Sequence, residues 1–303
     1  MAKNYGFLGR LALLGTAIIW GTSFVILKST LGSVSTLWLL SIRFSISAVI
    51  LMAFAARRLK KMDRRTVKGA VLMGVCLALA YIVQTYGLVY TTAGKNAFLT
   101  ATYCVLVPFL AWGIYKRKPG ANNIIAAVLC ITGIGFVSLN TGFDDVNIGD
   151  VLTLFCGIFY AFQIIMMENY IDGGDSLAIS AVEFSMAAVI CVAGALIFEP
   201  FPSDIPHGAY FSLAYLSVMC TAVCFFLQAW GMRYTPASTA AVIMTLEAVF
   251  GAFLSIALGY EQLTPRLAIG FALIFAAVLM SEVGGQLFEK LKKTKMNHKG
   301  ALP

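Results

Sequence analysis

Long apolar runs follow one another along almost the whole chain, and they limit how it can fold more than any other feature. A transmembrane helix needs about 20 mostly apolar residues, and the sequence holds ten runs of about that length. The runs lie at 8–28, 35–56, 67–90, 95–115, 122–140, 148–168, 177–198, 208–232, 236–258 and 265–287. Hydrophobic residues make up 60% of the 303 residues and charged residues 12%, compared with about 45–50% and about 25% in soluble domains. We therefore predict an all-α integral membrane protein of ten transmembrane helices.

The basic residues predict how these helices are oriented. The formal net charge is +8, and most of the 22 Lys and Arg side chains fall on one side of the predicted helices. Only Lys28, Lys95 and Arg266 fall on the other side, and Arg43 lies within a helix. Cytoplasmic loops are enriched in Lys and Arg, so we expect both termini to be cytoplasmic in a multi-pass protein of a bacterial cell membrane. No nucleic acid partner is expected, because the charges form short clusters between apolar runs.

An internal repeat is the next signal. A shift of 140 residues aligns the first run with the sixth, so that Trp20 meets Tyr160 and Lys28 meets Glu168. A shift of 144 aligns VQTYGLVYTTAGKNA, which begins at Val83, with LQAWGMRYTPASTAA. Two ordered blocks with nearly the same offset indicate that a five-helix unit was duplicated.

The duplication divides the chain into a first five-helix repeat at 8–140, a second at 148–287 and a basic cytoplasmic tail at 288–303. Because five is odd, the second unit must enter the membrane in the opposite orientation. Inverted repeats are typical of secondary transporters, whose halves exchange inward-open and outward-open shapes. The repeat therefore favours a transporter.

Several segments resemble one known family. They are WGTSF followed by Lys28, the Arg-Phe pair at Arg43, the helix that contains Pro108, and LGYEQLT followed by Gly270. Together they resemble the EamA-like branch of the drug/metabolite transporter superfamily over nearly the whole chain. The resemblance implies two copies of a five-helix unit and transport of a small solute. The glycine–glutamate pair of that family corresponds to Gly259–Glu261 here, with an inserted tyrosine.

Polar and aromatic residues recur at helical spacing in six of the predicted helices and at repeat-related positions. Polar side chains within a bilayer usually face a cavity or another helix, so we expect a central substrate cavity between the halves. The alternative is hydrogen bonding that only packs the helices together. The candidate cavity residues are Trp20, Ser23, Tyr81, Gln84, Thr100, Tyr103, Tyr160, Gln163, Gln228 and Glu247.

Charged residues within the apolar runs suggest further roles. Glu247 lies near the middle of its run, where an ionised carboxylate costs about 2.5 kcal/mol or more. It would bind a substrate amine, couple protons to transport, or make a structural hydrogen bond. The candidates for gate or access charges are Lys28, Arg43, Glu168 and Glu183. For these four, snorkelling and helix-end contacts are the alternative.

The sequence predicts no enzyme activity, no cofactor and no metal site. Its only two histidines lie in a loop and in the tail, and all seven cysteines lie in apolar runs. We expect a secondary transporter that works by alternating access and exports or exchanges an amino acid or a related or amphipathic compound. A channel and a membrane receptor or scaffold are the alternatives. Small residues in 122–140 and 265–287, such as Gly133 and Gly270, suggest close packing or a homodimer.

Overall fold

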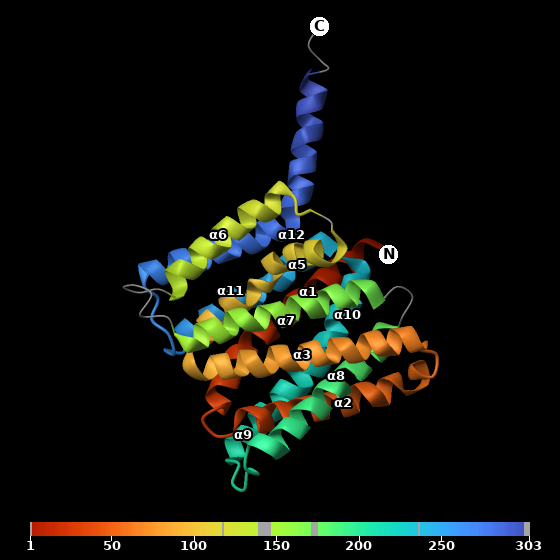
Figure 1. Ribbon diagram of the computed structural model, residues 1–303, viewed down its shortest axis with the longest axis vertical. Helices are drawn as coiled ribbons and strands as arrows, with labels where there is room; N and C mark the ends of the chain where they lie inside the picture. Colours follow the sequence, from red (N-terminus) through yellow and green to blue (C-terminus); the bar gives the residue numbers. More distant parts are fainter. Residues whose placement is uncertain (1, 117, 139–146, 171–174, 236, 300–303) are drawn as a thin grey trace.

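The computed structural model describes residues 2–116, 118–138, 147–170, 175–235 and 237–299, and every regular element in these ranges is a helix (Figure 1). The elements are α1 (Ala2–Thr30), α2 (Thr36–Leu59), α3 (Arg64–Tyr90), α4 (Ala93–Ala101), α5 (Tyr103–Tyr115), α6 (Ala121–Ser138), α7 (Ile148–Tyr170), α8 (Ser176–Phe198), α9 (His207–Ala214), the π-helix η2 (Tyr215–Val223), α10 (Cys224–Tyr234), α11 (Ala237–Ala257) and α12 (Pro265–Lys299).

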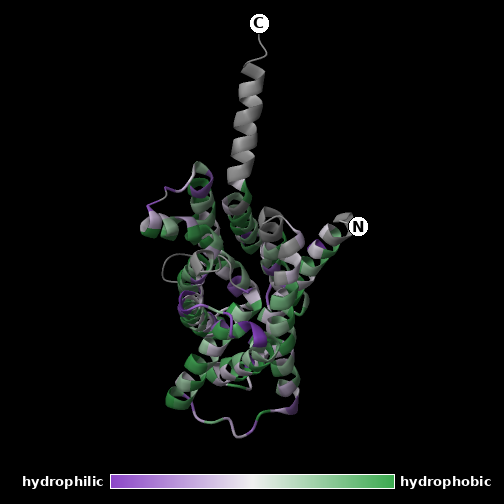
Figure 2. Cartoon of the chain, turned by 90° about the vertical axis from the view of Figure 1, so that its right-hand side faces the viewer, coloured by the Kyte–Doolittle hydropathy of each residue, from purple (hydrophilic) through white to green (hydrophobic). Residues whose placement is uncertain are grey.

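The helices have the length and surface of membrane-spanning segments. Eight described stretches are long and apolar enough to cross a membrane, and two shorter apolar helices are Ile243–Ala257 and Pro265–Ser281. Large apolar side chains point outward, including Phe54, Phe198 and Phe211, which are 73%, 77% and 77% exposed. Figure 2 shows hydrophobic colours over much of the helical surface. An all-helical membrane protein is thus confirmed, whereas the count of ten spanning helices and the cytoplasmic termini stay predictions.

The predicted helix at 95–115 is divided at Thr102 into α4 and α5. Pro108 lies inside α5, and proline has no N–H to donate to the carbonyl four residues earlier. That carbonyl belongs to Cys104, and the Ser281 hydroxyl of α12 donates to it over 3.1 Å. Because an unpaired backbone group is costly in a membrane, this bond compensates for the proline and ties α5 to α12.

The predicted helix at 208–232 has a π-helical middle, η2, between α9 and α10. Such wider turns are rare and frequently occur at functional sites. The Thr221 hydroxyl donates to the Leu216 carbonyl five residues earlier, over 2.9 Å. The wider turn directs Thr221 and the Cys220 carbonyl toward α2 and α1, where both accept hydrogen bonds.

The most extensive helix contacts each join the first half of the chain to the second, as in α3 with α7, α2 with α8, α6 with α12, and α1 with α11 and α10. Two of these crossings depend on paired glycines. A Cβ on Gly87 of α3 would lie 2.9 Å from the Gly149 carbonyl of α7, and one on Gly231 of α10 would lie 2.8 Å from the Gly9 carbonyl of α1. These crossings correspond to one another under the predicted repeat.

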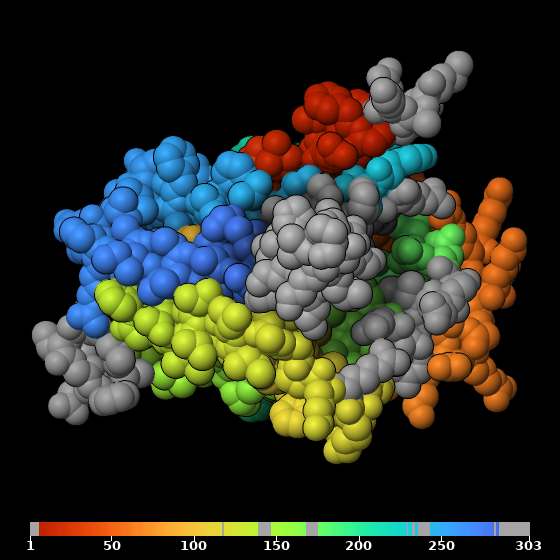
Figure 3. Space-filling model, turned by 90° about the horizontal axis from the view of Figure 1, so that it is seen from above, coloured from red at the N-terminus to blue at the C-terminus, as the bar shows by residue number. Residues whose placement is uncertain are grey.

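The small residues of α6 and α12 serve packing within the chain. Figure 3 shows the two helices side by side across one face of the molecule. A Cβ on Gly133 would lie 3.0 Å from the Gly270 carbonyl, so glycine lets the backbones approach. The expected close packing is therefore present between these helices, and the homodimer stays a prediction.

The C-terminal region is more regular than expected. The predicted basic tail, 288–303, continues α12 as a helix as far as Lys299. Figure 1 shows this last part of α12 extending away from the other helices. No proline interrupts the segment, so the sequence offers no residue that would end the helix earlier.

Candidate functional site

A cavity of about 190 Å³ lies between the two halves of the helical bundle. Its walls come from α1, α2, α3, α4 and α5 in the first half and from α7, α10 and α11 in the second. All ten candidate cavity residues line it: Trp20, Ser23, Tyr81, Gln84, Thr100, Tyr103, Tyr160, Gln163, Gln228 and Glu247. The structure thus brings the predicted faces around one space, and solute binding by these residues stays a prediction.

Aromatic rings form much of the cavity wall. The Tyr160 ring centroid lies 5.6 Å from that of Tyr81 and 5.7 Å from that of Tyr103. Trp20 packs edge-on against Phe225 with centroids 5.5 Å apart. Its indole N–H donates to the Cys220 carbonyl of η2 over 2.7 Å. The rings therefore join both halves along the cavity wall.

The two repeat-related glutamines differ in their contacts. Gln84 is 5% exposed; its amide oxygen accepts from the Tyr160 hydroxyl over 2.8 Å, and its amide nitrogen donates to the Thr100 hydroxyl over 2.8 Å. Gln228 also lines the cavity, and its side chain makes no hydrogen bond within the described chain. Gln84 therefore serves packing as well as the cavity wall, whereas the Gln228 amide is free to contact a solute.

Two charged side chains line the cavity from opposite halves. Arg43 of α2 is 2% exposed, and its Nε donates to the Thr221 hydroxyl over 3.1 Å. Its guanidinium lies 4.9 Å from the centroid of the Tyr81 ring. Glu247 of α11 makes no hydrogen bond or ion pair within the described chain. Arg43 was predicted to be a gate or access charge, but its side chain faces the central cavity.

Glu183 lies behind the cavity wall. It is fully buried, and Gln163 donates to its Oε1 over 2.7 Å. Its Oε2 has no partner among the described residues. Glu183 thus orients Gln163, which does reach the cavity. The side chain of Glu168, the fourth candidate charge, lies outside the described residues.

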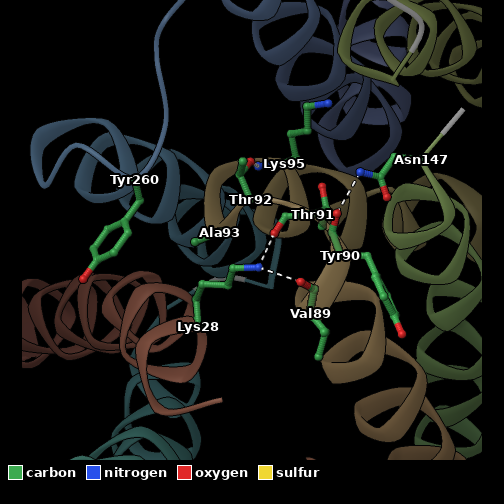
Figure 4. A pocket seen from close by; sticks show the side chains of 9 residues that line it. All are labelled: Lys28, Val89, Tyr90, Thr91, Thr92, Ala93, Lys95, Asn147 and Tyr260. Atoms are coloured by element: carbon green, nitrogen blue, oxygen red, sulfur yellow. Dashed lines mark hydrogen bonds between the residues drawn. The ribbon is translucent and has the colours of Figure 1, made fainter. Parts of the chain in front are cut away.

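Lys28 lies at one end of the bundle, beside a second cavity of about 260 Å³. Its ammonium donates to the carbonyls of Leu88, Val89 and Thr91 over 2.6, 2.9 and 2.8 Å. Figure 4 shows the side chain reaching from α1 to the end of α3. The helix-end contact that the sequence analysis held as an alternative is therefore present, and a gating role stays a prediction.

Sequence reasoning did not select two carboxylates at this end as site residues. Asp150 is fully buried, accepts from the Thr91 hydroxyl over 2.5 Å and lies 3.5 Å from the Lys95 ammonium. Glu261, in the connection between α11 and α12, accepts from the Thr92 hydroxyl. Burial raises the pKa of the Glu261 carboxyl, while the Thr92 hydrogen bond and the Lys95 ammonium lower it. The sequence did carry a signal for Glu261, because this residue corresponds to the glutamate of the glycine–glutamate pair in the family that the chain resembles.

Comparisons with known proteins agree with this architecture. A model described as the EamA-like transporter family matches residues 7–139 and 147–282. An uncharacterized transporter of Archaeoglobus fulgidus is 34% identical over 89% of this chain and 84% of its own. The uncharacterized transporter YoaV of Bacillus subtilis is 22% identical over 89% and 95%. One solved crystal structure shares the fold with a TM-score of 0.65 and 14% identity, covering 91% of this chain and 97% of the other.

Proposed function

Since the chain belongs to the EamA-like transporter family, we propose that it is a secondary transporter that carries a small metabolite across the cell membrane by alternating access. The membrane transporter class follows from the family. The substrate, the mechanism and the coupling are inferred below from the central cavity and the arrangement of the helices.

One observation carries the proposal: polar groups without protein partners line a cavity between the two halves of the bundle. Gln228 and Glu247 have no hydrogen bond within the described chain, and both line the cavity. Buried polar groups cost free energy unless they are paired. A polar solute would supply the missing partners, so the arrangement favours binding over a purely structural role.

The charges support an amino acid or a related amphipathic compound as the substrate. Arg43 offers a guanidinium, which binds carboxylates well, and Glu247 offers a carboxylate that would accept from an amine. The rings of Trp20, Tyr81 and Tyr160 supply apolar contact to the rest of the solute. A cavity of about 190 Å³ suits a small molecule. We propose an exporter or exchanger of such compounds.

Repeat-related contacts support alternating access. The glycine crossing between α3 and α7 has an equivalent between α10 and α1, as expected if two inverted repeats pack against one another. Such a pair exchanges two shapes around a fixed central site. A channel is a weaker alternative, because the free polar groups are isolated among aromatic and aliphatic side chains. A receptor or scaffold would not move solute.

The proposal is tested by solute flux. The purified protein is first screened by thermal shift against amino acids and related metabolites, because a ligand that binds only the folded state raises its stability. Hits are then followed as radiolabelled flux in proteoliposomes. We expect saturable uptake and exchange against internal substrate. Ligand binding without any flux would support the receptor alternative, and flux that does not saturate would support the channel.

Glu247→Gln separates the two functional roles of that carboxylate. If Glu247 couples protons, the variant still binds substrate and exchanges it but loses accumulation driven by a pH gradient. If the carboxylate pairs with a substrate amine, binding weakens by about 1.5–3 kcal/mol, the range for hydrogen bonds to charged groups. Asp204→Asn is the control, because Asp204 is exposed and does not line the cavity. Unchanged binding, flux and pH dependence in Glu247→Gln would leave Glu247 a packing residue.

A further inference from the structure

The turn between α3 and α4 places two opposite helix ends next to one another. α3 ends at Tyr90 and α4 begins at Ala93. The last carbonyls of a helix lack partners and carry partial negative charge, and its first N–H groups carry partial positive charge. One short turn therefore presents a site that favours a cation beside a site that favours an anion.

Lys28 occupies the carbonyl side of this turn. Its ammonium has three N–H donors, and it makes three hydrogen bonds, to Leu88, Val89 and Thr91. Figure 4 shows the bonds to Val89 and Thr91. Since all three donors are used, Lys28 has none left for a solute. Its contacts join the end of α1 to the end of α3.

Glu261 occupies the amide side of the same turn. Its Oε1 accepts from the hydroxyl of Thr92, which is the N-cap of α4. The carboxylate lies so close to α4 that a Cβ on Gly94 would be 2.0 Å from its Oε2. The glutamate is 8% exposed. Its contacts therefore join the connection after α11 to the beginning of α4.

Lys28 and Glu261 belong to one group of packed helices, and they contact the end of α3 and the start of α4 in a second group. α1 packs on α10 and α11, whereas α3 packs on α7, and α7 also packs on α5. The groups meet through α4, which contacts both α11 and α1. There the backbones are close: a Cβ on Gly94 would be 3.2 Å from the Ala252 Cα, and one on Gly251 would be 3.0 Å from the Ala97 Cβ.

α5 continues the predicted membrane crossing that α4 begins, and it packs on a different set of helices. Among the extensive helix contacts of the described chain, α5 packs on α7, α6 and α12, whereas α4 packs on α11 and α7. The contacts of α4 with α11 and α1 join the two groups at the α4 end of the cavity. A state closed at one end is one of the two states that alternating access requires.

We propose that Lys28 and Glu261 clamp the α3–α4 turn from its two sides and form the gate that closes the central cavity at this end. The clamp rests on the proposed alternating-access function and adds a device to it. Opening this end requires both contacts to break, because they hold the same turn. By the predicted topology this is the extracellular end.

The clamp is tested by the accessibility of a cysteine in the cavity. Ser23→Cys serves as reporter in a protein whose seven native cysteines are replaced, and a membrane-impermeant maleimide is added from the side of the α3–α4 turn. Lys28→Ala removes the contacts to α3, and Glu261→Ala removes the contact to Thr92. Gly94→Ala keeps both Lys28 and Glu261 in the sequence but adds a methyl group at the position that the Glu261 carboxylate occupies. We expect each to raise the labelling rate about tenfold or more, given the strength of hydrogen bonds to charged groups.

Matched controls separate gating from general damage. Lys68→Ala and Asp204→Ala remove exposed charges, and Gly113→Ala adds a methyl group where no atom lies within 4 Å; none should change labelling. Glu261→Gln should label within about twofold of the parent, because its amide oxygen still accepts from Thr92. Glu261→Gln also gives a variant at this position that can be measured if Glu261→Ala fails to fold.

Two outcomes decide the proposal. Faster labelling in Gly94→Ala and in at least one alanine variant at Lys28 or Glu261, in folded protein, supports the clamp. Labelling at the parent rate in all folded variants would overturn it. Substrate flux of the unmodified protein tests the carrier function separately. Saturable flux with unchanged labelling would reject the clamp alone, and faster labelling without flux of any solute would reject the carrier function alone.

Discussion

At the scale of single residues, the cavity divides its polar groups into those that hold the protein and those that are free. Gln84, Gln163 and Trp20 face the cavity but already have protein partners. Gln228 and Glu247 face it without partners in the described chain. The repeat-related glutamines therefore differ, because only Gln84 meets complementary groups within the described chain.

The two glutamines provide a direct test. Gln84→Ala leaves the hydroxyls of Tyr160 and Thr100 without their shared partner, and we expect the free energy of unfolding to fall by about 1–2 kcal/mol. Gln228→Ala removes no hydrogen bond within the described chain and should change the free energy of unfolding by less than about 0.5 kcal/mol, while substrate flux falls. Unfolding in detergent and flux in proteoliposomes measure the two effects. Equal destabilisation by both changes would contradict this division.

Glu261 predicts a pH dependence. Burial raises the pKa of its carboxyl in the clamped state, against the lowering effects of Thr92 and Lys95, with Asp150 also nearby and raising it. A group with a higher pKa in one state binds protons preferentially in that state. Lower pH should therefore favour the clamped state and slow labelling of the Ser23→Cys reporter. Because maleimide reacts with the thiolate, labelling slows at lower pH in every variant, but it should slow less in Glu261→Gln than in the parent. An equal slowing in both would show that Glu261 does not contribute.

At the scale of helices, irregular turns occur where contacts between the halves need them. Pro108 frees the Cys104 carbonyl, and Ser281 compensates from α12. The π-helix η2 turns Thr221 toward Arg43 and the Cys220 carbonyl toward Trp20. In both cases a break in the regular hydrogen-bond pattern is satisfied by a side chain from a distant helix.

The compensation by Ser281 is measurable as a coupling. Ser281→Ala should lower the free energy of unfolding by about 1 kcal/mol, because the Cys104 carbonyl loses its donor. In a Pro108→Ala background residue 108 regains an N–H that bonds this carbonyl, so the same change should cost less. A double-mutant cycle measures the difference. Additive effects would show that Ser281 acts independently of the proline.

At the scale of the whole molecule, the protein is a set of pairs formed between its two halves. The extensive contacts of α1, α2, α3 and α6 are all with helices of the second half. Neither half would bury its faces without the other. The central cavity lies where these pairs meet, and in the proposed mechanism a relative movement of the halves would open it to one side or the other.

The predicted orientation is tested by labelling the connections. Single cysteines at 200–206 should react with an impermeant maleimide from outside the cell, and cysteines at 57–65 only after the membrane is opened. The expectation follows from the Lys and Arg residues concentrated near 57–68. Reaction of 57–65 in intact cells would reverse the orientation and place the α3–α4 clamp on the cytoplasmic side.

The sequence by itself predicted the membrane class, the family and polar and aromatic helix faces for a central cavity, because these depend on apolar run length and on helical spacing, both of which are local. Tertiary structure decided the rest. Arg43 faces the cavity and contacts the π-helix, Gln84 is paired whereas Gln228 is not, and Lys28 and Glu261 meet at one turn. These contacts join residues up to 178 positions apart, and they depend on helix rotation and crossing, which local spacing does not specify.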